Sequence, residues 1–118
     1  MLITKNSIVY LLLPNIPAGY FHSFYGYPVI IRPDSPFTRK ELVNFLEKHD
    51  IETRAFMGGD LSLQPAYRNT PCKTPFVMPN TKLMLNNAFF IGCHPSISSE
   101  QKKHITNTFD EFFSKIKI

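Results

Sequence analysis

The stretch that decides the fold is residues 51–65, IETRAFMGGDLSLQP, near the middle of a chain of 118 residues. Residues 52–57 follow a helix pattern directly and predict a strand that ends at a pair of glycines. The chain then runs through Gln64-Pro65 to an aromatic residue, Tyr67. Residues 58–82 hold two glycines and four prolines, so we interpret them as one long ordered loop. A loop of that length in a compact domain is usually functional.

The helix ahead of this stretch carries its own start signal. Thr38 and Glu41 have the spacing of a capping box, in which each side chain satisfies a free backbone amide. An apolar stripe at helical spacing follows, made of Leu42, Phe45, Leu46 and His49. The pattern ends at Asp50, a negative residue at the end where the helix dipole favours a positive one.

The remaining patterns predict further strands and a second helix. Short apolar runs at residues 10–13, 29–31 and 87–93 predict strands. Ser98 and Gln101 form a second capping box ahead of a helix over residues 99–115, with an apolar stripe at Ile105, Phe109, Phe112 and Ile116. This order predicts an α+β fold, a small, mostly antiparallel sheet of three to four strands with helices packed on one face. We expect residues 1–9 to be an N-terminal extension and residues 10–118 to form one domain.

Composition narrows the classes of partner. Hydrophobic residues make up 43% of the chain and charged residues 19%, as in ordinary globular proteins. The net charge of +4 is spread along the chain, which argues against a nucleic-acid surface. The apolar run at residues 8–13 is too short to span a membrane, and nearby prolines make it a poor signal peptide. Two cysteines, Cys72 and Cys93, fit a reduced compartment. We therefore expect a cytoplasmic protein without a nucleic-acid or membrane partner.

Aromatic residues are unusually frequent, with eleven Phe and five Tyr. Five of them crowd into one irregular segment: Tyr20, Phe21, Phe24, Tyr25 and Tyr27. They belong either to the core or to a surface that a partner covers, because large contiguous apolar patches are seldom left in water. We expect a homo-oligomer that self-associates through residues 10–28.

Metal and nucleophile chemistry find little support in the sequence. Ligands of small zinc sites are usually paired two to four residues apart. Cys93 and His94 are adjacent, so on a strand they would face opposite sides. No third residue stands out that would orient a Cys–His nucleophile pair. We expect neither a metal site nor a catalytic residue in this chain.

Taken in order, these patterns resemble the C-terminal small domain of the DegT/DnrJ-type sugar aminotransferases, which are PLP enzymes with the aspartate aminotransferase fold. Within that family the resemblance is to the CDP-4-keto-6-deoxyglucose 3-dehydrase branch of lipopolysaccharide biosynthesis. The likeness covers roughly residues 10–115. It is carried by residues 23–28 (SFYGYP), 38–45 (TRKELVNF), Thr53-Arg54, 61–65 (LSLQP), Pro79-Asn80-Thr81, Asn86, and 89–92 (FFIG).

The resemblance implies a domain that is not catalytic alone. A PLP enzyme needs a phosphate cradle, an acid at the pyridine nitrogen, a ring stacked on the cofactor, and a lysine or its replacement for proton transfer. The family keeps these in its large domain, so we expect no cofactor in this chain, although the full-length family uses PLP. Nucleotide-sugar binding is expected only if a large domain is supplied. The chain would then be the C-terminal domain, or a truncated remnant, of a sugar-nucleotide aminotransferase or dehydrase.

Two departures from the family pattern bear on substrate binding. Leu63 stands where the family has an arginine before Gln-Pro, and Lys82-Leu83 stands where it has Asp-Arg. Arginine clamps phosphates and carboxylates with two charge-assisted hydrogen bonds, and leucine makes none. These losses indicate either a decayed remnant or a different substrate.

Four residues are candidates for substrate binding: Ser23, Tyr25, Arg54 and Asn86. Arg54 would present an anion donor to an interdomain cleft, or it pairs with an acid such as Asp60. Ser23 and Tyr25 line a ligand cleft or simply adjoin the apolar cluster, and Asn86 binds ligand or caps the third strand. Two other functions stay open: a noncatalytic, self-associating interaction module that uses the aromatic face, and a free-standing carbohydrate or nucleotide-sugar binder.

Overall fold

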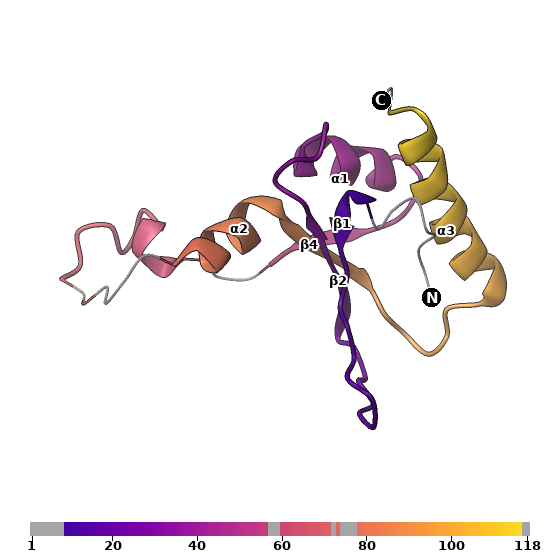
Figure 1. The fold of residues 1–118 in the computed structure, drawn as a ribbon, viewed down its shortest axis with the longest axis horizontal. Helices are drawn as coiled ribbons and strands as arrows, with labels where there is room; N and C mark the ends of the chain where they lie inside the picture. The colour runs from indigo at the N-terminus through magenta and orange to yellow at the C-terminus, as the bar shows by residue number, and fades with distance from the viewer. Residues whose placement is uncertain (1–8, 57–59, 72, 74–77, 117–118) are drawn as a thin grey trace.

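A computed structural model describes residues 9–56, 60–71, 73 and 78–116. Gly58-Gly59, Cys72 and most of the expected N-terminal extension lie outside the described residues. Along the chain the elements are β1 (Leu11–Leu12), β2 (Gly26–Ile31), α1 (Arg39–Glu47), β3 (Thr53–Ala55), a 3-10 turn η2 (Leu61–Leu63), α2 (Pro79–Asn87), β4 (Ala88–Gly92) and α3 (Ser99–Ser114). Figure 1 shows their arrangement.

The strands form a four-stranded antiparallel sheet in the order β1-β2-β4-β3. The expected α+β class is therefore confirmed. The second strand is longer than the sequence pattern predicted, because it begins at Gly26 and includes Pro28. Pro28 has no amide hydrogen to donate, and it is tolerated because β1 pairs only with Ile30 and Ile31 of β2.

One face of the sheet carries the core, together with α1 and α3 (Figure 1). Side chains alternate between the faces of a strand. Val29 and Phe89 are directly opposite each other in the register and are both buried on this face. The helices supply the other half of the core. Its most deeply buried members are Leu11, Val29, Ile31, Leu42, Leu46, Phe89, Ile91 and Phe109.

Both predicted capping boxes are confirmed. Thr38 caps α1 with Glu41, and Ser98 caps α3 with Gln101. The geometry at the C-terminal end of α1 explains why Asp50 is found there. This residue has a positive φ of 60°, and the amide of the next residue, Ile51, donates to the carbonyl of Leu46. Such a left-handed residue closes a helix end, and aspartate tolerates it better than most side chains.

The last helix buries a slightly different stripe from the predicted one. Phe109 is fully buried as expected, but Phe113, not Phe112, is its buried neighbour. Phe112 is half-buried and packs edge-on against Phe37, with ring centroids 5.1 Å apart. Phe37, which lies outside the helix, packs against the aromatic rings of α3, a contact that the helix pattern alone did not indicate.

Helix α2 was not predicted, since residues 58–82 were interpreted as loop up to the third strand. It begins at Pro79, at a position where proline's missing amide hydrogen costs nothing. Side-chain hydrogen bonds fix the C-terminal end of α2 to the rest of the domain. The Arg39 guanidinium donates to the carbonyls of Leu85 at 2.8 Å and Ala88 at 3.1 Å, and the Asn87 side chain donates to the Ile31 carbonyl at 2.9 Å.

Two segments project beyond this body. One joins β1 to β2 and extends at the bottom of Figure 1, and α2 with the turn ahead of it extends at the left. The radius of gyration is 16.2 Å. A compact chain of this length has a radius of gyration of about 13–14 Å. The difference reflects the two projections.

Candidate functional site

The face of the sheet opposite α1 and α3 carries the candidate site. Pro28, Phe90 and Arg54 lie opposite one another on three neighbouring strands, so their side chains form a row across this face. Two residues along the strands, Gly26 and Gly92 are also paired and form the next row on the same face. We call this surface, made of Gly26, Pro28, Arg54, Phe90 and Gly92, the open face.

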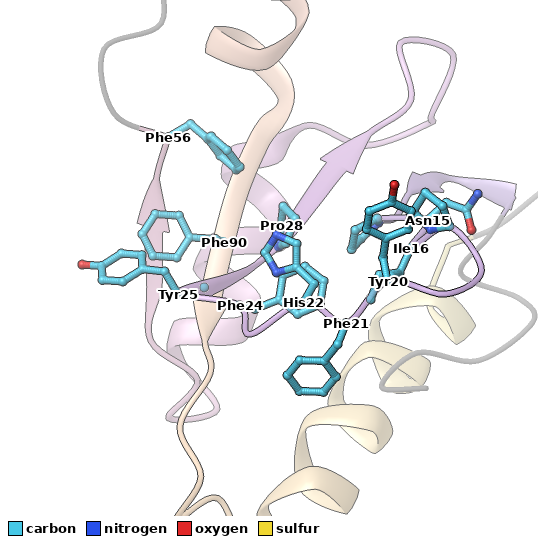
Figure 2. A pocket seen from close by; sticks show the side chains of 13 residues that line it. Asn15, Ile16, Tyr20, Phe21, His22, Phe24, Tyr25, Pro28, Phe56 and Phe90 are labelled. Atoms are coloured by element: carbon cyan, nitrogen blue, oxygen red, sulfur yellow. The ribbon is translucent and has the colours of Figure 1, made fainter.

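A hollow of about 610 Å³ lies over part of the open face. Its floor is Pro28 and Phe90, and its sides come from Phe56 and from residues 14–25, which we call the aromatic arm. Figure 2 shows Tyr25 next to Phe90, and Tyr20 on the far side. None of the thirteen described side chains that line this hollow is an Asp, Glu, Lys or Arg.

Phe90 lies across Gly26, and the contact depends on the absence of a side chain there. A Cβ placed on Gly26 would be only 2.2 Å from Cδ2 of the Phe90 ring. Tyr25 then contacts the ring from beside it, with centroids 5.9 Å apart. Our sequence analysis missed Phe90 as a site residue. The signal was present, because two successive aromatics in one strand, Phe89 and Phe90, must face opposite sides.

A second hollow, of about 590 Å³, continues past Tyr25 and Phe90 toward the N-terminal end of α3. Arg54 lines it together with Tyr25, so the structure brings two of the four candidate residues together. The Arg54 guanidinium forms an ion pair with Glu52, not with Asp60 as the alternative interpretation suggested. Asp60 instead accepts hydrogen bonds from the Ser62 amide and hydroxyl.

Ser23 and Asn86 lie elsewhere. Ser23 is exposed on the aromatic arm and lines a third hollow of about 520 Å³ beside Cys93 and Lys102. Asn86 is exposed in the last turn of α2, two residues before β4 begins. It lines none of these three hollows. The residue that does bond to the sheet is its neighbour Asn87.

Comparison with known proteins shows which family shares this sequence pattern. The sequence profile of the DegT/DnrJ/EryC1/StrS aminotransferase family matches residues 6–110, most of the chain. The chain belongs to this aminotransferase family.

Curated relatives of the chain are much longer proteins. "Lipopolysaccharide biosynthesis protein RfbH" of Salmonella typhimurium is 32% identical over 104 residues, which is 88% of this chain and 24% of that protein. A dTDP-4-dehydro-2,6-dideoxy-D-glucose 3-dehydratase of Saccharopolyspora spinosa is 30% identical over 105 residues, 89% of this chain and 23% of that protein. The chain therefore spans about a quarter of the length of the curated relatives that it matches.

Solved structures of the family share the fold. A DegT/DnrJ/EryC1/StrS aminotransferase from Brucella abortus superposes with a TM-score of 0.74 at 20% identity, covering 94% of this chain and 28% of that one. The Escherichia coli GDP-4-keto-6-deoxy-D-mannose-3-dehydratase, solved with bound hydrated PLP, gives a TM-score of 0.72 at 23% identity. That match covers 85% of this chain and 25% of the dehydratase.

Cys93 and His94 are the reactive side chains that directly follow β4. Burial raises the pKa of the Cys93 thiol, although a hydrogen bond with the Tyr27 backbone partly opposes the shift. A thiol with a raised pKa is a weak nucleophile at neutral pH. The His94 ring bonds instead to Ser96, whose hydroxyl lies 2.6 Å from Nδ1.

The described residues contain neither a cluster of metal ligands nor a membrane-spanning helix. In this part of the chain no three His, Cys, Asp or Glu side chains gather where they would hold a metal ion. No helix among the described residues has the length and apolarity to cross a bilayer.

Proposed function

We propose that this chain is the C-terminal small domain of a PLP-dependent sugar-nucleotide aminotransferase or dehydrase of lipopolysaccharide or deoxysugar biosynthesis. It completes such an enzyme only together with a large domain and is not catalytic alone. The observation that carries the proposal is the pair of coverages: the family profile spans most of this chain, while the chain spans about a quarter of its curated relatives.

The open face supports this role. It is an apolar surface at whose edge a cation, Arg54, and a phenol, Tyr25, line the same hollow. A large domain seated there would cover the apolar part and turn the hollow into a cleft between domains, where ligand sites preferentially occur. Arg54 would then offer an anionic ligand two parallel hydrogen bonds, once its guanidinium leaves Glu52.

A chimaera tests the proposal. The whole chain would replace the matching quarter of the Saccharopolyspora spinosa 3-dehydratase, and the readouts are the visible absorbance of bound PLP and consumption of that enzyme's named substrate. We expect the chimaera to retain PLP and to turn substrate over, and the chain alone to do neither.

Two variants of the chimaera separate docking from folding. Phe90→Asp places a charge at the centre of the open face and should abolish turnover. Lys103→Ala is the control, because Lys103 is exposed on α3, away from that face. A folded chimaera that neither retains PLP nor reacts would contradict the proposal, and so would turnover by the chain alone.

A further inference from the structure

Three aromatic side chains on one side of the molecule are almost fully in water. Tyr20 is 76% exposed, Phe21 93% and Tyr25 83%. The two other aromatics of the same segment behave differently. Phe24 and Tyr27 are half-buried and pack edge-on against each other, with centroids 5.4 Å apart. The aromatic arm is thus held to the sheet by Phe24, while its other rings face outward.

The exposed rings adjoin the hollow over the open face. Tyr20, Phe21 and Tyr25 all line it, and Tyr25 and Phe90 also line the second hollow. In Figure 2 the Phe21 ring points away from the hollow, while Tyr25 lies beside Phe90. The surface therefore combines a projecting apolar side chain, Phe21, with an apolar recess, the first hollow.

The area of this surface suits a dimer. Aromatic side chains bury about 150–250 Å² each, so at the measured exposures these three rings present roughly 400–600 Å². Two copies face to face would bury roughly twice that from the rings alone. Ile16, which is 41% exposed, and the half-buried Phe90 would bring the total near the 1,200–2,000 Å² or so of stable interfaces.

Charge does not oppose this pairing. The charged groups that line the neighbouring hollows are Arg54, Lys102, Asp50 and Glu52, two of each sign. Arg54 and Glu52 already neutralise each other. Bringing two identical surfaces together therefore places no block of like charges across the interface, a juxtaposition that would be costly.

We infer that the aromatic arm and the open face form a docking surface for a second copy of this chain. The pairing is two-fold, so that the same patch serves both partners and each Phe21 faces the recess of the other copy. It needs no large domain, and a large domain seated on the open face would compete with it. The dimer is thus a property of the chain on its own.

The test is the molar mass in solution over a wide range of concentrations, measured by sedimentation. The monomer is 13.6 kDa, and we expect twice that mass at high concentration. The double variant Phe21→Ser with Tyr25→Ser should weaken dimerisation at least about tenfold, as loss of central aromatic contacts does. At concentrations where both proteins are monomeric, it should leave the circular dichroism spectrum and the thermal midpoint unchanged, because both side chains are exposed in the monomer.

Tyr67→Ser is the matched control, since Tyr67 is 52% exposed but lies in the turn after η2. It should leave the dimer intact. A monomer at every concentration would overturn the inference, and so would a dimer that the double variant does not weaken. Neither result bears on the chimaera, whose turnover tests the proposed function separately.

Discussion

At the scale of single residues, small local geometries decide where larger groups lie. Gly26 lets the Phe90 ring lie across β2, and that ring forms the floor of the hollow. Asp50 takes the left-handed conformation that ends α1 and directs Ile51 into the core. The apparent mismatch between Asp50 and the helix dipole is therefore offset by its role as the closing residue.

Gly26→Ala should destabilise the domain by about 1–3 kcal/mol, because the new methyl group must displace the Phe90 ring. Urea unfolding measures the loss. In a Phe90→Ala background the same change should cost much less, since the clash is gone. Gly92→Ala is the control, because a Cβ there meets nothing within 4 Å. Equal costs in both backgrounds would contradict the packing seen here.

The capping box of α1 should make stability depend on pH. The Thr38 amide and hydroxyl each donate to Glu41 Oε2 at 2.7 Å, and these bonds lower the pKa of the carboxyl in the folded state. The stabilisation is present above the unfolded pKa, which is about 4.3. It is lost as pH falls through the lower folded value.

Glu41→Gln removes this titrating group while keeping an acceptor at the same place. We expect wild type to have the higher urea midpoint near neutral pH and the two midpoints to converge in acid. Lys40→Gln serves as the comparison, because lysine stays charged over this range and its curve should run parallel to wild type. A gap between wild type and Glu41→Gln that stays constant down to low pH would count against the capping bond.

At the scale of elements, packing against the sheet distinguishes the helices. α1 and α3 each bury apolar side chains, whereas α2 buries none of its own. α2 is instead tied at its C-terminal end by Arg39 and Asn87, which satisfy backbone carbonyls. A helix of this kind depends on its neighbours more than on its own sequence.

Phe109→Ala should cost about 3–5 kcal/mol, because the side chain is fully buried and leaves a cavity in the core. Phe112→Ala should cost less, since its ring is only half-buried. Both are measured by urea unfolding at neutral pH. A loss below about 1 kcal/mol for Phe109→Ala would mean that α3 does not pack on the sheet in solution.

At the scale of the whole molecule, one face of the sheet is covered by helices and the other carries the first hollow. The described lysines line neither the first nor the second hollow. A PLP site requires a phosphate cradle, and a lysine or its replacement for proton transfer, around the same small volume. The first hollow is lined largely by apolar and aromatic side chains, a lining that suits a docking surface.

Added PLP should produce no stable visible absorbance band and no thermal shift in the chain by itself. The physical reason is that a surface without a phosphate cradle and a neighbouring lysine holds the cofactor only weakly. Absorbance after dialysis and a thermal melt measure this. A saturable band that survives dialysis would show that this chain holds the cofactor without a large domain.

Patterns that act over a few residues were readable from the sequence. Both capping boxes join residues three positions apart, and the helix stripes recur within one element, so α1, α3 and most of the strands were predicted. The motifs between residues 10 and 115 also identified the family, which the profile match confirms. α2 was missed because its Met78 start has no side-chain cap, and its stabilising contact comes from Arg39, 46 residues before Leu85.

Only two of the four candidate residues were correctly placed together by the sequence, because the site is assembled from residues of different strands and the arm. Sequence alone named Tyr25 and Arg54. The strand register placed Arg54 opposite Phe90, and Tyr25 packs beside the same ring, whereas Asn86 lies apart from them in α2. The exposure of individual aromatic side chains also depended on the tertiary structure. Phe24 and Tyr25 are neighbours in sequence, yet the first packs on Tyr27 and the second stands in water. Sequence alone determined which local elements form, because their hydrogen bonds close within a few residues. Only the tertiary structure decided which face stays open, because that depends on the pairing of strands far apart in the chain.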